Sequence, residues 1–137
     1  MQQRTIPYIL LTLILSILAM GNAYAEGDDT AEFPVYIELK PDFIVNYSIS
    51  GARLKYIKTS ITLRAKASSA EVIQLNMPIV RDAIVMFLSE LKAAQVSGAL
   101  AREQSRKDVL TALNAALKEE TGQEPVMDVL FASFVTQ

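Results

Sequence analysis

The spacing of hydrophobic and polar residues divides the chain into an apolar start, an alternating region and a helical region. Between residues 35 and 67, apolar and polar positions alternate with the period of two that is typical of half-buried strands. The alternation predicts strands over 35–39, 43–49 and 53–67, with Pro41 and Asp42 separating the first two. In the longest strand the apolar phase shifts between Tyr56 and Ile57, so we expect a β-bulge there.

After residue 68 the period becomes helical, and a final strand follows. The pattern predicts a helix that is capped by Ser68 or Ser69 and runs to Leu91, with a kink or restart at Pro78, because proline lacks the backbone N–H. It also predicts a second helix over 100–119, which ends before Gly122. Residues 125–136 carry apolar side chains on both faces, so we expect a strand in the interior of the sheet. The order β-β-β-α-α-β predicts an α+β fold, with a largely antiparallel sheet packed against two helices.

The first 25 residues have the features of an export segment. Arg4 precedes an apolar run, which ends in the cleavage signature Ala23-Tyr24-Ala25. We therefore expect a signal peptide over 1–25 and a mature chain that begins at Glu26. A second interpretation stays open, because residues 6–25 approach the ~20 residues that an uncleaved membrane anchor needs. In both cases the body of the protein lies outside the cytoplasm.

The rest of the chain is long enough for one domain. Residues 26–32 are acidic and without periodicity, and we interpret them as a disordered leader. Residues 33–137 then form a single domain.

Composition narrows the functions that this domain can have. The chain contains no His, no Cys and no Trp, so the usual zinc sites and Ser-His-Asp or Cys-His catalytic systems are excluded. The formal net charge of −2 is unlike the basic surface of nucleic-acid-binding domains. We therefore predict a protein that is not an enzyme and uses no cofactor or metal.

One face of the first helix is a candidate interaction surface. At 100° per residue, Arg81 and Ser89 share a polar sector that also contains Val85, with Met86 at its edge. The opposite face already has enough apolar residues to pack on a sheet, so Val85 and Met86 are candidates for contact with another chain. The alternative is that the second helix of the domain covers them.

A basic stripe is a second candidate. Lys58, Arg64 and Lys66 share the polar face of the long strand, and no acidic residue lies between Asp42 and Glu71. The stripe is suited to an acidic partner or to anionic lipid head groups. The interpretation that we favour is a solvated face whose lysines protect a sheet edge. The mixed charges of residues 102–108 are interpreted as a solvated helix surface without further function.

Four segments together resemble a known family. They are Val35-Tyr-Ile-Glu-Leu-Lys-Pro41, Leu54-Lys-Tyr-Ile57, the proline-led helix Met77-Pro-Ile-Val-Arg-Asp-Ala-Ile-Val-Met-Phe-Leu-Ser89, and the end Val129-Leu-Phe-Ala-Ser-Phe-Val-Thr-Gln137. Their order and spacing resemble the FliL family of flagellar basal-body-associated proteins. Family members usually carry an uncleaved anchor and a longer linker, whereas this chain has a cleavage signature and only residues 26–32.

The resemblance carries implications that the residue pattern alone does not. It implies a periplasmic domain similar to the stomatin-like (SPFH) fold, which assembles into rings at the flagellar basal body. It also implies contact with the stator units and other basal-body proteins, support of motility, and inner-membrane anchoring if the N-terminal segment is retained. The competing hypothesis is a general periplasmic binding or chaperone-like module, which would use an apolar groove between helix and sheet.

Overall fold

The structure of the protein, a computed structural model, describes residues 32–47 and 55–137. Within it, the compact unit begins at Glu32, whose carboxylate accepts a 2.9 Å hydrogen bond from the Ser68 hydroxyl. The expected signal peptide or anchor over 1–25, and the expected leader up to residue 31, lie outside the described residues.

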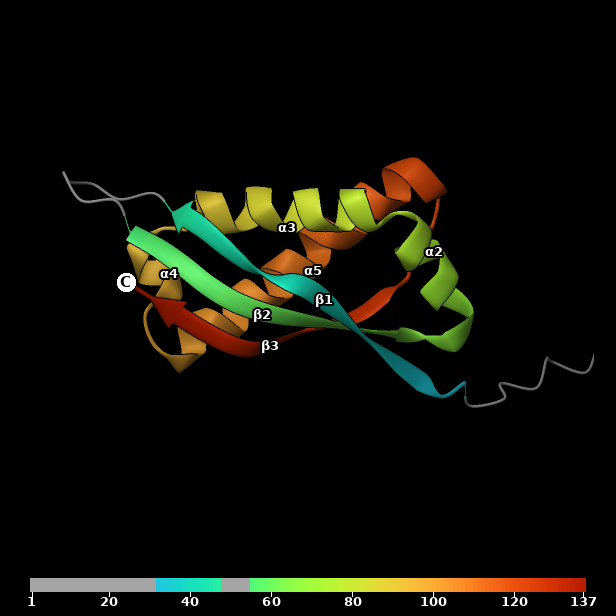
Figure 1. Ribbon diagram of the computed structural model, residues 1–137, viewed down its shortest axis with the longest axis horizontal. Coiled ribbons are helices and arrows are strands. Elements are labelled where there is room, and N and C mark those ends of the chain that lie inside the picture. Colours follow the sequence, from blue (N-terminus) through green and yellow to red (C-terminus); the bar gives the residue numbers. More distant parts are fainter. Residues whose placement is uncertain (1–31, 48–54) are drawn as a thin grey trace, which may run out of the picture. The chain divides into compact units, whose positions relative to one another are not determined.

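Three antiparallel strands form the sheet: β1 (Pro34–Tyr47), β2 (Lys55–Lys66) and β3 (Val126–Thr136). Their order among the described residues is β1-β2-β3, so β2 lies at the centre (Figure 1). Strict alternation along β2 sends one set of side chains into the core and the other to the opposite face. The inward set is Ile57, Thr59, Ile61, Leu63 and Ala65.

The two strands that the sequence predicted over 35–39 and 43–49 belong to a single strand, β1. Pro41 does not end the strand, because the chain passes it in a bulge between Leu39 and Phe43 and then resumes pairing with β2. Proline is compatible with this position because β1 is an edge strand, where a missing N–H costs no ladder bond. The predicted bulge between Tyr56 and Ile57 is wrong, since both residues pair regularly with β1. Tyr56 instead faces outward, and it donates a hydrogen bond of 2.5 Å to the Gln137 side chain.

The helical region follows the predicted plan with additional short elements. A 3-10 turn η1 (Ala67–Ser69) leads into α2 (Ala70–Leu75), and α3 (Met77–Glu90) restarts at the proline after a bend of 80°. A short α4 (Ala93–Val96) precedes α5 (Ala99–Thr121). Gly122 ends α5 with a φ of 73°, a left-handed conformation that glycine adopts at little cost.

The core lies between one face of the sheet and the helices α3 and α5 (Figure 1). Each helix contributes a buried stripe at helical spacing. These stripes are Val80, Ile84 and Leu88 from α3, and Ser105, Val109, Leu113 and Leu117 from α5. The fold is therefore α+β with an antiparallel sheet, as predicted, although the described sheet has three strands where the sequence predicted four.

The position predicted for the last strand is wrong. In the described part of the chain, β3 lies at the edge of the sheet and only one of its faces packs on the helices. The apparent second apolar face comes from a bulge at Ala132, where the pairing with β2 shifts between Ser60 and Ile61. This bulge places Phe131 and Phe134 on the same inward face, although they are three residues apart.

Candidate functional site

The α3 surface is the first candidate, defined by Val85 and Met86. Their side chains are 39% and 53% exposed, so α5 does not cover them. Ser89, in the next turn, is partly buried and donates its hydroxyl hydrogen bond to the Met86 carbonyl at 2.7 Å. The surface has the exposure that a protein contact needs, and the contact itself stays a prediction.

Arg81, the fourth residue of that prediction, is used inside the domain. Its guanidinium donates a 3.0 Å hydrogen bond to the Pro41 carbonyl oxygen. Its charge also lies 4.3 Å from the centroid of the Phe43 ring, within cation–π range. Arg81 therefore ties α3 to the bulge of β1, and its charge is not free to define the α3 surface.

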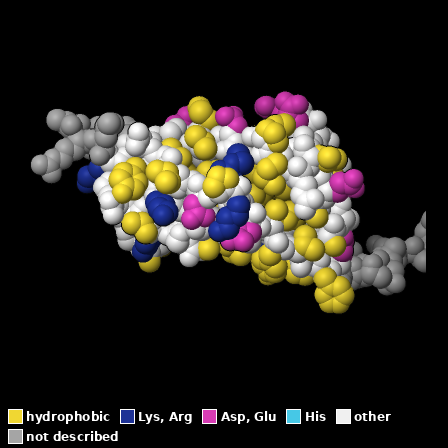
Figure 2. Space-filling view, in the orientation of Figure 1, with side chains coloured by type: hydrophobic (Ala, Val, Ile, Leu, Met, Phe, Trp, Pro, Cys, Tyr) yellow, Lys and Arg dark blue, Asp and Glu magenta, His cyan; other side chains and the backbone are white. Residues whose placement is uncertain are grey.

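The basic stripe lies on the face of β2 that points away from the helices. Lys58 and Lys66 are exposed, whereas Arg64 is partly buried. The register places Lys58 between Ile44 and Val135 on the neighbouring strands. In Figure 2, which views the sheet from this side, basic side chains are interleaved with hydrophobic and acidic ones. The three residues thus share one face, but they do not form a uniformly basic patch.

Acidic residues of β1 reduce the charge of that face. Lys40 forms ion pairs with Glu38 at 2.8 Å and with Asp42 at 3.4 Å. A hydrogen bond with Ser60, together with Lys40 and Lys58, holds the pKa of Asp42 below its ordinary value. The sequence could not reveal this neutralisation, because the acids come from the adjacent strand.

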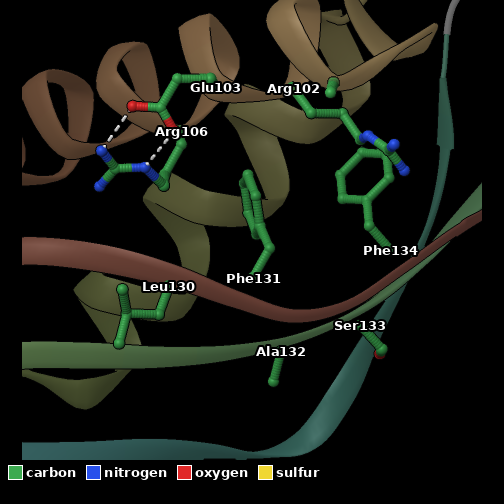
Figure 3. Close-up of a pocket in the computed structure, with 9 residues that line it drawn as sticks. Arg102, Glu103, Arg106, Leu130, Phe131, Ala132, Ser133 and Phe134 are labelled. Atoms are coloured by element: carbon green, nitrogen blue, oxygen red, sulfur yellow. Dashed lines mark hydrogen bonds and ion pairs between the residues drawn. The ribbon is translucent and has the colours of Figure 1, made fainter.

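A cavity of about 420 Å³ lies between the first turns of α5 and the second half of β3. In Figure 3 the rings of Phe131 and Phe134 point from β3 toward α5, and the Arg102 side chain reaches toward Phe134. The two ring centroids are 5.2 Å apart, and the rings are tilted by 59°. We name this site, with Ala99 and Arg102 on its helical side, the aromatic cavity.

Sequence reasoning missed this cavity and treated residues 102–108 only as a solvated surface. The available signal was the pair of phenylalanines three residues apart in an otherwise alternating strand. That spacing has both rings on one face only if a bulge intervenes, as it does at Ala132.

Arg106 closes one end of the cavity through ion pairs. It binds Glu103 at 2.7 Å within α5 and also pairs with Asp128 at the start of β3. The hydrogen bond from Arg106 holds the pKa of Glu103 below its ordinary value, and the same bond raises the pKa of Arg106. Arg102 has no ion-pair partner within residues 32–47 and 55–137. The cavity rim therefore presents one free positive charge in the described structure.

Side chains protect only the first half of the free β3 edge. Asn114 of α5 donates to the Val126 carbonyl oxygen at 2.8 Å and accepts from the Val126 amide at 3.1 Å. At Val129, Asp128 accepts from the amide at 2.9 Å and Arg106 donates to the carbonyl. From Phe131 onward, no side-chain hydrogen bond covers the outer backbone edge of β3 in the described part of the chain. The uncovered half of the edge borders the aromatic cavity.

The described residues contain no cluster of His, Cys, Asp or Glu that could hold a metal ion. Within the same ranges, no single helix has the length and hydrophobicity to cross a membrane. Residues 67–75 and 77–90 reach that length and composition only as a pair, which is bent by 80°.

Comparison with known proteins identifies the family. Residues 36–137, which span nearly the whole described domain, match the family model of the flagellar basal body-associated protein FliL. The chain belongs to the FliL family. The flagellar protein FliL of Aquifex aeolicus (strain VF5) is 33% identical over 107 residues, which cover 77% of this chain. This FliL-family chain matches 63% of the length of that relative.

Proposed function

We propose that this FliL-family chain is a non-enzymatic basal-body protein that supports motor and stator function, and hence motility, through ring-like self-assembly and protein contacts. The family match over residues 36–137 carries this proposal, because it covers the folded domain and not a short motif. The exposed α3 surface and the aromatic cavity provide surfaces for such contacts. The proposed partners are further copies of the chain, stator units and other basal-body proteins.

The proposed location is the periplasm. The cleavage signature at Ala23-Tyr24-Ala25 supports removal of residues 1–25, and an uncleaved segment would anchor the domain to the inner membrane. A domain architecture like that of stomatin-like (SPFH) proteins is part of the same proposal, and it rests on the resemblance to the family.

The first test is genetic. Deletion of the gene in its own strain is expected to reduce swimming or swarming while flagellar filaments are still produced, and a tagged chain is expected to localise to the basal body. Normal motility, or a uniform envelope distribution, would contradict the flagellar role.

The second test concerns the α3 surface. Val85→Asp is expected to lower the free energy of unfolding by about 1 kcal/mol or less, because the side chain is 39% exposed and lies outside the buried stripe of α3. It is expected to reduce motility, since a charge buried in an interface without a partner is costly. Leu75→Asp, at an exposed apolar position on α2, is the matched control. Equal motility of the two variants would remove the α3 surface from the proposal.

A further inference from the structure

The end of β3 leaves backbone hydrogen-bonding groups unused on the outer edge of the sheet. The Gln137 amide donates to the Tyr56 carbonyl at 3.1 Å, and the Gln137 carbonyl accepts from the Tyr56 amide at 3.0 Å. Because backbone groups alternate along an antiparallel pair, those of Thr136 and Phe134 point away from β2. No hydrogen bond meets them from that side within residues 32–47 and 55–137. The edge therefore presents N–H donors and carbonyl acceptors in the register of a strand.

Helix α5 covers the start of this edge but not its end. Its side chains bond the backbone of Val126 and Val129. Near Phe134, however, α5 presents Ala99, whose methyl group forms no hydrogen bond, and Arg102, which has no ion-pair partner in the described ranges. The strand also contains no proline. A further strand can therefore pair with the end of β3 without displacing an existing contact.

The aromatic cavity lies where the side chains of such a strand would point. Neighbouring strands are about 4.8 Å apart, and directly paired residues face the same side of the sheet. Phe134 faces α5, so a residue paired with it on an added strand would also face α5 (Figure 3). The space available there is the cavity of about 420 Å³, which falls in the ~300–1,000 Å³ range of ligand sites. An apolar side chain can occupy it and contact Phe134 without separating the two phenylalanine rings.

The charge of the cavity favours an acidic segment. Arg106 is already paired with Glu103 and Asp128, whereas Arg102 is unpaired in the part of the chain that the structure describes. The Arg102 side chain reaches toward Phe134, beside the unused backbone groups. A carboxylate on the inward face of an added strand would therefore form a charge-assisted hydrogen bond with Arg102.

A second copy of the chain is a poorer match for this edge. Its β3 would bring residues 131–136, which contain no acidic side chain, together with a second Arg102. Its β1 contains Pro34 and Pro41, which lack the N–H that pairing needs. Its β2 is central and is already paired on both sides. None of the described strands supplies both a free edge and a carboxylate, so another protein is the partner that fits.

We propose that an extended acidic segment of another protein adds to the sheet as a fourth strand beside Phe134 and Thr136. One large apolar side chain of the segment enters the aromatic cavity, and a carboxylate two residues away pairs with Arg102. Residues two apart on a strand face the same side and lie about 7 Å apart, so one segment can supply both groups. In this mode of recognition, backbone hydrogen bonds give affinity and the pocket gives specificity. The inference rests on the proposed function, whose protein contacts it assigns to one edge and one class of segment.

The experiment measures binding of the fluorescent peptide Thr-Thr-Phe-Thr-Glu-Thr-Thr to the full chain, purified in detergent. In an extended peptide the Phe and Glu side chains share one face. One isomer is N-methylated at Phe and Glu, and a second at the threonines that follow them, so that each isomer has one edge blocked. We expect one isomer to bind like the parent peptide and the other at least about tenfold more weakly, because it loses two hydrogen bonds.

Substitutions in the chain test the edge and the cavity separately. Thr136→Pro removes an outward N–H but no bond to β2, and is expected to weaken binding about fivefold or more, whereas Thr136→Ala keeps the N–H and the affinity. Ala99→Trp fills the helical side of the cavity and is expected to abolish binding. Ala115→Trp, roughly 24 Å further along α5, is the matched control. Unchanged thermal melting of each variant shows that the fold is retained.

A charge exchange tests the assignment of Arg102. Arg102→Glu is expected to weaken binding of the parent peptide by up to about fivefold, and to strengthen binding of a peptide with Lys in place of Glu by a similar factor. Lys107→Glu makes the same change of charge on α5 outside the cavity, and is expected to leave the preference for Glu unchanged.

Several outcomes would overturn the proposal. They are no binding of the parent peptide, equal binding of the two N-methylated isomers, and a Thr136→Pro variant that binds the peptide normally. A chain that is oligomeric as wild type, monomeric as Thr136→Pro and unable to bind the peptide would show that the occupant is a second copy.

The proposed function has a separate readout, which is motility. Peptide binding that needs these groups, in a strain whose deletion mutant swims normally, would support the added strand and refute the flagellar role. Motility that is lost on deletion of the gene but retained in Thr136→Pro, without peptide binding, would refute the added strand and support the flagellar role.

Discussion

Each edge strand of the described sheet contacts an arginine from a helix, but the two arginines protect the two edges to different extents. At β1, Arg81 of α3 donates to the Pro41 carbonyl and covers the Phe43 ring, and the strand itself contains Pro34, Pro41 and a bulge. At β3, Arg106 of α5 pairs with Asp128 near the start of the strand and with Glu103 of its own helix. A proline hinders the addition of another strand because it lacks the backbone N–H, and β3 contains no proline. The comparison indicates that β1 is protected against pairing with a further strand, whereas the second half of β3 is accessible to one.

The largest expected difference between the edges is in packing. Phe43 and Phe134 both pair with Thr59, one from each side of β2, so the same substitution tests both edges at the same level of the sheet. Phe43 is buried, and Phe43→Ala is expected to lower the free energy of unfolding by about 3–5 kcal/mol. Phe134 is half-buried, and Phe134→Ala is expected to cost about 1–2 kcal/mol. Urea unfolding measures both, and equal losses would show that the two edges are packed alike.

A smaller effect is expected for the arginine of the β1 edge. Arg81→Ala removes a charge-assisted hydrogen bond and a cation–π contact, and we expect a loss of about 2 kcal/mol in thermal or urea unfolding. Arg81→Lys is the control for charge. It is expected to recover less than half of that loss, because an ammonium group lacks the planar fork that serves the carbonyl and the ring together. Full recovery of stability in Arg81→Lys would mean that the positive charge alone accounts for the contribution of Arg81.

The smallest effect is expected at the β3 edge and depends on pH. Because Arg106 lowers the pKa of Glu103 in the folded state, the ionised carboxylate stabilises the fold above its ordinary pKa. That contribution disappears as the pH falls through the lowered folded-state pKa. The difference in stability between the wild type and Arg106→Gln is therefore expected to be greatest near neutral pH and to narrow in acid.

Denaturant titrations of Arg106→Gln from neutral to acidic pH, with Lys107→Gln as the control, measure this change. Lys107 lies 3.9 Å from Glu103 and makes only a weak pair, so its variant should follow the wild-type pH dependence. A wild-type advantage over Arg106→Gln that stays constant with pH would contradict the role given to the Glu103 pair.

Local features of the fold were predictable from sequence, and the arrangement of the strands was not. Pro78 and Gly122 affect the backbone only within about one helical turn, so their effects can be predicted from the local sequence. The restart at α3 and the end of α5 agree with the prediction. The helical period also identified Val85 and Met86 as residues outside the core stripe. The edge position of β3 depends on pairing between residues that are about 60 to 80 positions apart, which a pattern of apolar residues does not encode.

The aromatic cavity illustrates the same limit. Its two walls come from the start of α5 and the end of β3, and each looks ordinary by itself: a charged helix surface and an apolar strand. The bulge at Ala132, which turns Phe131 and Phe134 to one side, becomes visible only when β2 provides the register. The exposure of Phe33 could not be predicted either. From the sequence, an apolar residue just before a strand is expected to pack in the core, whereas Phe33 is exposed in the folded domain.

The Asn114 side chain has a further consequence for the β3 edge. A carboxamide contains the same donor and acceptor as a peptide bond, and Asn114 presents both to the amide and carbonyl of Val126. Helix α5 thus imitates one residue of a fourth strand at the start of β3. An added strand could not pair with Val126, because Asn114 already occupies both of its backbone groups. It could pair only further along β3, where the aromatic cavity lies.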